Sequence, residues 1–211
     1  MTTRDTATRA RLLKAAERLF ADRGFKKVTV RDICRAARAN VAAVNYHFGD
    51  KLGLYREVLQ SAIDQMRATN DAARLAGEGR PAEEQLRCYI GVFVRRVLGS
   101  GTDTVHKLLN REMNDPTPAL DALVEQGLRP RVQYLAALIA EIIGCAPTDH
   151  RVLRCIASVQ TQFIAYLPNP ITTRLGVSVK PTPANLDEIT AHVAEFSLAG
   201  IHAIRRAGHG R

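Results

Sequence analysis

The sequence lacks the features that would place it outside the cell or in a membrane. Its cysteines, Cys34, Cys88, Cys145 and Cys155, include no CxxC pair and show no spacing typical of a disulfide framework. No apolar run approaches the roughly 18 residues of a membrane span, and the N-terminus has no apolar segment typical of a signal peptide. We therefore expect a protein of the reducing cytoplasm with no membrane partner.

Motifs of the common enzyme classes are also missing. The chain contains no P-loop, no GxSxG, no HExxH and no GxGxxG motif. His192 and Glu195 stand three residues apart, a spacing used in metal-binding bundles, but the second carboxylate motif of such bundles is absent. A solvated histidine explains this pair better. We therefore expect no enzymatic activity, no cofactor and no metal ion.

No stretch of six or more residues has the pattern of a β-strand, whereas apolar residues recur at helical spacing along most of the chain. With 211 residues, 46% of them hydrophobic, the protein can bury a sizeable core. The predicted fold is all-α with about nine helices. They span residues 7–23, 30–37, 41–47, 51–75, 81–98, 103–113, 118–143 with an interruption near Gly127 and Pro130, 149–167 and 186–206. Residues 168–185 are predicted to form a long irregular loop.

Two short helices separated by a polar turn can be recognised in residues 29–51, TVRDICRAARANVAAVNYHFGDK. Thr29 and Asp32 have the spacing of a capping box, and Asn40 is a suitable N-cap for the second helix. That second helix has only about two turns and depends on packing, for which Val44 is placed on its inner side. Two helices joined in this way are typical of a helix-turn-helix, whose second helix enters the major groove of DNA.

The outer face of the second helix carries small and hydrogen-bonding side chains that can approach base edges closely. These side chains belong to Asn40, Val41, Ala42, Asn45 and Tyr46. Charge supports the same partner, because residues 1–60 hold 13 Lys and Arg against 6 Asp and Glu, a net +7 of the total +9. A solvated basic surface explains the charge alone equally well, and the helix-turn-helix pattern favours DNA.

The stretch resembles the DNA-binding domain of the TetR family of bacterial repressors. The segments TVRDIC, ARAN, VAAVNYHF and DK match its second helix, turn, recognition helix and the start of its fourth helix, and RLLKAAERLFADRGF matches its first helix. The resemblance covers about residues 8–60. It implies a DNA-binding domain at residues 1–50 and a ligand-binding and dimerisation domain at residues 51–211, linked by the helix 51–75. The C-terminal part resembles the CecR/CerR-like subfamily through REMNDPTPALDALVEQGLRP and HVAEFSLAGI.

Two positions depart from the family pattern. Arg38 stands where the turn usually carries Gly, and a left-handed backbone costs other residues about 1 kcal/mol or more. Asn45 stands where the family usually has a phosphate-binding Tyr.

The predicted DNA-binding residues divide by role. Those expected to face bases are Arg31, Asn40, Val41, Ala42 and Asn45, and those expected to hold phosphates are Thr29, Tyr46, His47 and Lys51, with Arg38 adding a contact. Cys34 lies close to this surface, where it could act as a redox sensor or simply fill space as a small buried residue.

Two further partners follow from the resemblance, a second copy of the chain and a small-molecule effector. The candidate dimer-interface residues on the last two long helices are Val152, Ile156, Val159, Ile189, Val193, Phe196, Gly200 and Ala203. From the sequence alone these stripes face either a second copy or the protomer's own core. The pool of candidate effector-binding residues is Tyr89, Phe93, His106, Asn110, Met113, Gln162, Phe163 and Tyr166, each of which ordinary core packing also explains.

The predicted function is that of a ligand-responsive homodimeric repressor that binds a palindromic operator. The alternative is a non-specific or architectural DNA-binding helical protein without an effector. Basic charge confined to the first 60 residues favours the repressor, because a DNA-coating protein spreads such charge over its whole length.

Overall fold

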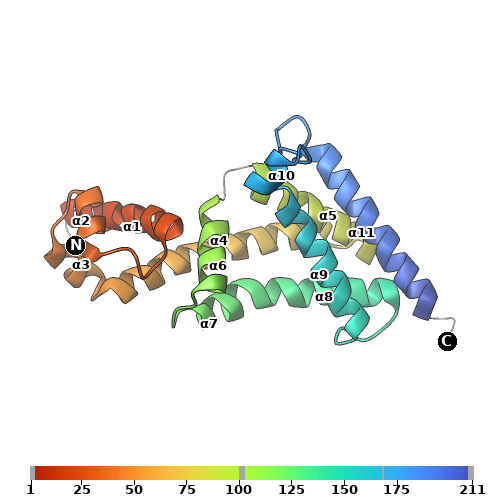
Figure 1. The fold of residues 1–211 in the computed structure, drawn as a ribbon. Helices are drawn as coiled ribbons and strands as arrows, with labels where there is room; N and C mark the ends of the chain where they lie inside the picture. Colours follow the sequence, from red (N-terminus) through yellow and green to blue (C-terminus); the bar gives the residue numbers. More distant parts are fainter. Residues whose placement is uncertain (1–2, 100–102, 168, 209–211) are drawn as a thin grey trace. The chain divides into compact units, whose positions relative to one another are not determined.

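The computed structural model describes residues 3–99, 103–167 and 169–208, and it is helical with no β-strand in these ranges (Figure 1). The α-helices are α1 (Thr3–Arg23), α2 (Val30–Ala37), α3 (Val41–Phe48), α4 (Lys51–Gly77), α5 (Ala82–Phe93), α6 (Asp103–Asn114), α7 (Leu120–Ala122), α8 (Arg129–Ile143), α9 (His150–Ala165), α10 (Pro170–Arg174) and α11 (Leu186–Gly208). Two π-helical segments, η1 (Val94–Leu98) and η2 (Leu123–Leu128), continue α5 and precede α8. The all-α prediction is confirmed. No helix in the described ranges is long and apolar enough to cross a membrane.

The chain forms two compact units. Unit 1 comprises Met1–Met66 and Asp103–Gly127, and unit 2 comprises Arg67–Thr102 and Leu128–Arg211. The unit that contains the helix-turn-helix is thus larger than residues 1–50, because it includes the first part of α4 and all of α6. The functional boundary at residue 50 stays a prediction.

The helix starts follow local capping rules. Thr29 Oγ1 accepts the N–H of Asp32 at 3.1 Å, and the Asp32 carboxylate accepts the N–H of Thr29 at 3.0 Å, which completes the predicted capping box. The side chains of Asn40, Asp50 and Asp149 accept backbone N–H groups two or three residues further on, at 2.8, 2.7 and 2.8 Å. These bonds satisfy amides that a helix leaves without partners at its first turn.

Three local predictions are corrected. Helix α1 begins at Thr3, four residues before the predicted start at residue 7. A short helix, α10, interrupts the predicted loop, because Asn169 caps it with a 2.8 Å bond and Pro170 occupies its first turn, where its fixed φ is favourable. The interruption expected near Gly127 takes the form of the π segment η2 rather than a break in the helix.

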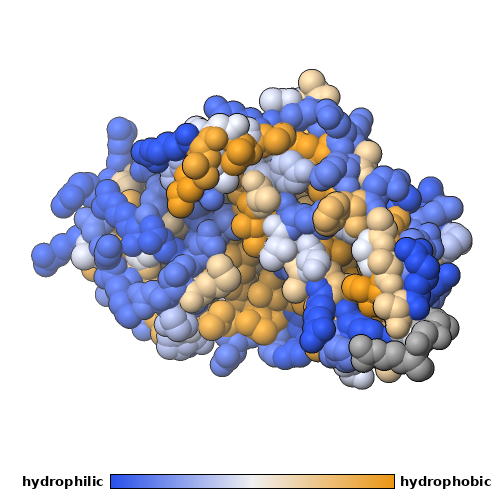
Figure 2. All heavy atoms as spheres, turned by 45° about the vertical axis from the view of Figure 1, so that its right-hand side comes forward, coloured by the Kyte–Doolittle hydropathy of each residue, from blue (hydrophilic) through white to orange (hydrophobic). Residues whose placement is uncertain are grey.

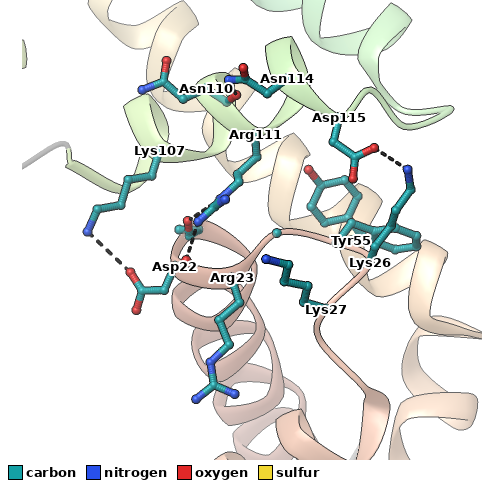
Figure 3. Close-up of a pocket in the computed structure, with 13 residues that line it drawn as sticks. Asp22, Arg23, Lys26, Lys27, Tyr55, Lys107, Asn110, Arg111, Asn114 and Asp115 are labelled. Carbon is teal, nitrogen blue, oxygen red and sulfur yellow. Dashed lines mark hydrogen bonds and ion pairs between the residues drawn. The ribbon is translucent and has the colours of Figure 1, made fainter.

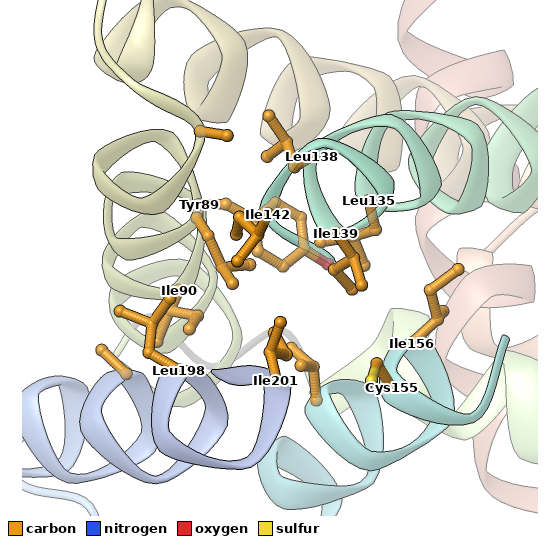
Figure 4. Close-up of a cluster of buried hydrophobic side chains, with 14 of the residues drawn as sticks. Tyr89, Ile90, Leu135, Leu138, Ile139, Ile142, Cys155, Ile156, Leu198 and Ile201 are labelled. Carbon is orange, nitrogen blue, oxygen red and sulfur yellow. The ribbon is translucent and has the colours of Figure 1, made fainter. Parts of the chain in front are cut away.

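Each unit has its own hydrophobic core. The core of unit 1 is formed mainly by α1 to α4 and includes Leu12, Phe20, Ile33, Val44 and Leu54, all fully buried. The core of unit 2 is formed by side chains of α5, α8, α9 and α11, and Figure 4 shows Ile90, Ile139, Ile156 and Ile201 from these four helices facing one another. Since a recognition helix of eight residues is too short to be stable alone, the core of unit 1 is what holds α3 in place.

Candidate nucleic-acid interface

The outer face of α3 is open to solvent. Asn45 and Tyr46 are exposed, Tyr46 by 74%, whereas Val44 on the opposite side is fully buried. Asn40, Val41 and Ala42 are exposed as well, so all five side chains expected on the outer face lie there. On α2, Ile33 and Ala37 are buried, whereas Ala36 is exposed. The outer face of α3 is therefore short and almost uncharged, and the buried Val44 anchors the helix from its inner side.

The turn between α2 and α3 contains a strained residue. Arg38 has φ 51° and ψ 51°, and it is the only residue other than glycine with a positive φ in the described ranges. Its N–H donates to the carbonyl of Arg35, and the N–H of Ala39 donates to Cys34 at 3.0 Å, which closes the end of α2. The left-handed backbone expected at this position is therefore present, although the residue has a Cβ.

Arginines line the exposed side of α2. Arg31, Arg35 and Arg38 are all exposed, and the contact of Arg35 with Asp32 is long, at 3.8 Å. Exposed guanidinium groups beside a recognition helix can reach the phosphates or guanine edges of a duplex.

His47 is placed differently from the expected phosphate contact. Its side chain is only 5% exposed, and its Nε2 lies 3.2 Å from the Asp5 carboxylate of α1. The ring is also enclosed by Tyr46 and Phe48, with ring centroids 5.0 and 5.9 Å away. His47 thus joins the end of α3 to the start of α1. Asp5 was not recognised from the sequence, because the pairing depends on the packing of α1 against α3.

Two other expected phosphate contacts have partners within the protein. The amine of Lys51 lies 4.2 Å from the ring centroid of Phe25, and partial burial lowers its pKa. The hydroxyl of Thr29 donates to the Asp32 carboxylate at 2.6 Å while it caps α2. Thr29 is nevertheless exposed, and Lys51 is partly exposed.

Cys34 is not a suitable redox sensor. It is buried in the core of unit 1, and this burial raises the pKa of its thiol. Oxidation requires an accessible thiolate, so the structure favours the reading as a small buried residue.

A pocket of about 540 Å³ lies in unit 1 between the end of α1 and α6 (Figure 3). Charged side chains join its walls: Lys107 pairs with Asp22, and Lys26 pairs with Asp115. The guanidinium of Arg111 donates to the backbone carbonyls of Ala21 and Asp22 at the C-terminus of α1. Cations at a helix C-terminus are favourable, so these contacts fasten α6 to α1.

The chain matches known families over most of its length. Residues 82–201 match the C-terminal domain of the HTH-type transcriptional dual regulator CecR, and residues 12–58 match the bacterial regulatory proteins of the tetR family. This protein belongs to the TetR family of transcriptional regulators. It is therefore a sequence-specific transcriptional regulator that binds DNA.

The relatives of this TetR-family regulator are also regulators. The chain is 32% identical to CecR of Shigella flexneri over 175 residues, which cover 79% of this chain and 78% of that protein. It is 30% identical to the regulator TtgR of Pseudomonas putida over 109 residues, half of each chain. The crystal structure of PfmR from Thermus thermophilus covers 90% of this chain and 98% of its own with a TM-score of 0.64 and 19% identity, a likeness that shows the fold alone.

The candidate effector-binding residues of this regulator do not all lie in the same unit. His106, Asn110 and Met113 lie on α6 in unit 1, where His106 and Asn110 are hydrogen-bonded at 3.0 Å and Met113 is 71% exposed. Met113 therefore does not line a cavity, and Asn110 lines the polar pocket described above. The other five, Tyr89, Phe93, Gln162, Phe163 and Tyr166, lie in unit 2, where Tyr89, Phe93 and Phe163 are buried together.

Most of the candidate dimer-interface residues are core residues instead. Val152, Ile156, Val159, Ile189 and Val193 are buried in the core of unit 2, because α9 and α11 turn these side chains toward α5 and α8. Phe196, Gly200 and Ala203 are exposed, Phe196 by 67%. The prediction of an interface is thus wrong for the first five, and it remains a prediction for the last three.

Proposed function

We propose that this TetR-family regulator acts in the cytoplasm as a homodimeric repressor that binds a palindromic operator and is released from it by a small molecule. The observation that carries the proposal is the exposed outer face of α3, with Asn45 and Tyr46 free to enter a groove. One helix of eight residues contacts few base pairs, so selectivity for a single site requires two such helices on adjacent half-sites.

Asn45 and Arg31 are the strongest candidates for reading bases. An amide forms a bidentate pair with adenine, and a guanidinium forms one with guanine, whereas the small side chains of Val41 and Ala42 allow close approach to the groove floor. The Tyr46 hydroxyl and the Lys51 amine are candidates for holding phosphates, and the exposed Arg38 adds charge beside them. His47 is better assigned to positioning α3 through Asp5.

The proposed dimer surface lies on the outer sides of α9 and α11. Leu153 and Ile164 on α9 are exposed by 54% and 55%, and Phe196 on α11 lies beside the small residues Gly200 and Ala203. Figure 2 shows hydrophobic residues exposed among hydrophilic ones on one face of the molecule. Small residues allow two helices to approach closely around a large aromatic anchor, which favours a second copy of this chain as the partner.

A response to a small molecule requires a connection between the two units, and α4 provides one. This helix begins three residues after α3 ends and continues without a break from unit 1 into unit 2. A molecule that binds unit 2 more tightly in a state unfit for the operator would shift the dimer toward that state.

DNA binding is tested by footprinting on inverted repeats upstream of the coding gene, in the presence of excess competitor DNA. We expect one protected palindrome. Asn45→Ala should change the preferred sequence, whereas Lys51→Gln should weaken binding to all sequences and reduce the salt dependence by about one phosphate contact. Binding that follows salt but not sequence would instead establish the alternative, a non-specific DNA-coating protein.

Dimerisation is tested by light scattering on Gly200→Arg. A Cβ added at Gly200 meets no atom within 4 Å and the position is exposed, so this variant should fold normally and become monomeric. Ala76→Arg, on the exposed side of α4, is the matched control and should remain a dimer. A Gly200→Arg protein that stays dimeric would rule out this surface.

A further inference from the structure

The buried polar atoms without hydrogen-bond partners are all in unit 2. Within the described part of the chain they are Oδ1 and Nδ2 of Asn70, the hydroxyl of Tyr89 and Nε of Arg131. A buried polar group without a partner is unfavourable, and more so when it is charged. Three residues with this defect in one small unit therefore indicate partners that the chain itself does not supply.

Arg131 and Tyr89 lie at the same aromatic cluster. The guanidinium carbon of Arg131 is 5.4 Å from the ring centroid of Phe93, and the Tyr89 ring is 4.4 Å from the same ring. Phe163 completes the cluster, with its centroid 5.9 Å from that of Phe93. Arg131 donates from Nη2 to the Gln160 side chain at 3.0 Å, which leaves its Nε–H without an acceptor.

Asn70 is on the part of α4 that belongs to unit 2. The guanidinium of Arg74 stacks on the ring of Tyr134 at 4.6 Å, and this contact fixes α4 beside α8. Asn70 precedes Arg74, and Arg131 precedes Tyr134, by about one helical turn each. The Tyr134 ring centroid is in turn 6.3 Å from that of Tyr89, so α4 reaches the cluster through Arg74.

An anionic group on a ligand could accept hydrogen bonds from the unpaired donors. Burial raises the pKa of Tyr89, against a smaller lowering by Arg131, so the hydroxyl remains a neutral donor at physiological pH. The Nε–H of Arg131 and the amide of Asn70 are donors too. No carboxylate forms an ion pair with Arg131 among the described residues, and the buried Nε–H of this half-buried residue is left without an acceptor.

One π-helical segment adjoins this cluster, because η1 begins immediately after Phe93. Single π-helical turns within α-helices are frequent at functional sites, because they widen the helix where a ligand or a special side chain must be accommodated.

We propose that Arg131 and Tyr89, together with the rings of Phe93 and Phe163, form the effector site, and that the effector is a small acid in which an anionic oxygen group is attached to an aromatic ring. The anion accepts the free donors of Arg131 and Tyr89, and its ring packs among Phe93 and Phe163. This assignment rests on the proposed function as a ligand-responsive repressor, and it names the class of ligand to which the repressor responds.

The first test compares three probes by calorimetry and thermal unfolding of the full-length protein. Benzoate carries both features of the proposed ligand, benzamide has the ring without the charge, and inorganic phosphate has the charge without the ring. We expect benzoate to raise the Tm and to bind at least about tenfold more tightly than either control. Equal binding of benzoate and benzamide, or no benzoate binding at about 10 mM, would overturn the assignment.

The second test uses Tyr89→Phe, which removes only the unpaired hydroxyl. Ligand-free Tyr89→Phe should have a Tm equal to or above that of the wild type, yet bind benzoate about tenfold more weakly. Arg131→Gln should abolish the preference for benzoate over benzamide, and Arg131→Lys should restore part of it. A lower Tm for Tyr89→Phe with unchanged benzoate affinity would show that a buried water satisfies the hydroxyl and that the residue is structural.

Operator binding separates the failure of this inference from that of the proposed function. Wild-type protein that binds its palindrome but ignores benzoate would disprove the ligand class and leave the repressor assignment intact. Protein that binds benzoate through Arg131 but no palindrome would disprove the repressor assignment and leave the anion site intact.

Discussion

The hydroxyl of Tyr55 donates a 2.5 Å hydrogen bond to the carboxylate of Glu112, and each residue is only 1% exposed. The same carboxylate accepts the backbone N–H and the hydroxyl of Thr117, both at 3.0 Å. Burial, and then the bond to Glu112, raises the pKa of Tyr55, so its proton stays in place. The buried carboxylate of Glu112 thus has hydrogen-bond partners in Tyr55 and Thr117. Its bond to Tyr55 connects α6 to α4 within unit 1.

We expect Tyr55→Phe and Glu112→Gln each to lower the free energy of unfolding by about 1–3 kcal/mol, because each leaves a buried polar group with fewer partners. In a double-mutant cycle followed by urea denaturation, the two changes should couple by about 0.5–3 kcal/mol. The matched control is Tyr46→Phe, which removes an exposed hydroxyl and should change stability by less than about 0.5 kcal/mol. Strictly additive effects would show that the 2.5 Å bond contributes nothing.

Arg38 offers a test of backbone strain at the turn. Arg38→Gly and Arg38→Ala remove the same charge, but only Gly adopts a φ of 51° without a steric penalty. We expect the Gly variant to be more stable than the Ala variant by about 1 kcal/mol in chemical denaturation. Since both lose the guanidinium, their operator affinities should depend on salt in the same way. Equal stabilities would mean that the turn carries no strain.

Variants of Asp5 and His47 can show whether His47 positions α3 or contacts a phosphate. If the pair holds α3 in place, Asp5→Asn and His47→Gln should each weaken operator binding, and the double variant should be no weaker than the worse single one. If His47 instead binds phosphate, removing the competing Asp5 carboxylate should strengthen binding. Gel-shift titrations of the three variants at one salt concentration decide between these opposite outcomes.

Asp149 should make stability depend on pH in a defined window. Its hydrogen bonds with the Arg151 side chain, and then with the Arg151 backbone, lower its pKa from 3.8 to about 2. The pKa of Asp149 is lower in the folded than in the unfolded protein. The ionised carboxylate therefore stabilises the fold above about pH 4, and this stabilisation disappears as the pH falls toward 2.

Asp149→Asn keeps a good N-cap but removes the charge, so it isolates that contribution. Its Tm should lie below that of the wild type at neutral pH, and the difference should vanish near pH 2. Arg151→Gln removes the other half of the pair and should show the same convergence. A difference in Tm that stays constant with pH would contradict the ionic origin.

Most of the local structure of this protein, and its family, could be read from the amino-acid sequence. Thr29, Asn40 and Gly144 act on amides and carbonyls within a few residues of themselves, so their roles as caps could be read without tertiary information. The outward direction of Asn45 and Tyr46 followed in the same way from the period of the helix.

The partner that each side chain meets across the fold depends on how the helices pack. Val193 and Phe196 lie three residues apart in one apolar pattern, yet one is buried in the protomer and the other is exposed, because α11 packs against α5 and α8 with one side only. His47 is enclosed through Asp5, 42 positions earlier in the chain, and Tyr89 has its hydroxyl unpaired because of what surrounds it. Such pairings depend on how distant helices dock, and helical period carries no information about docking.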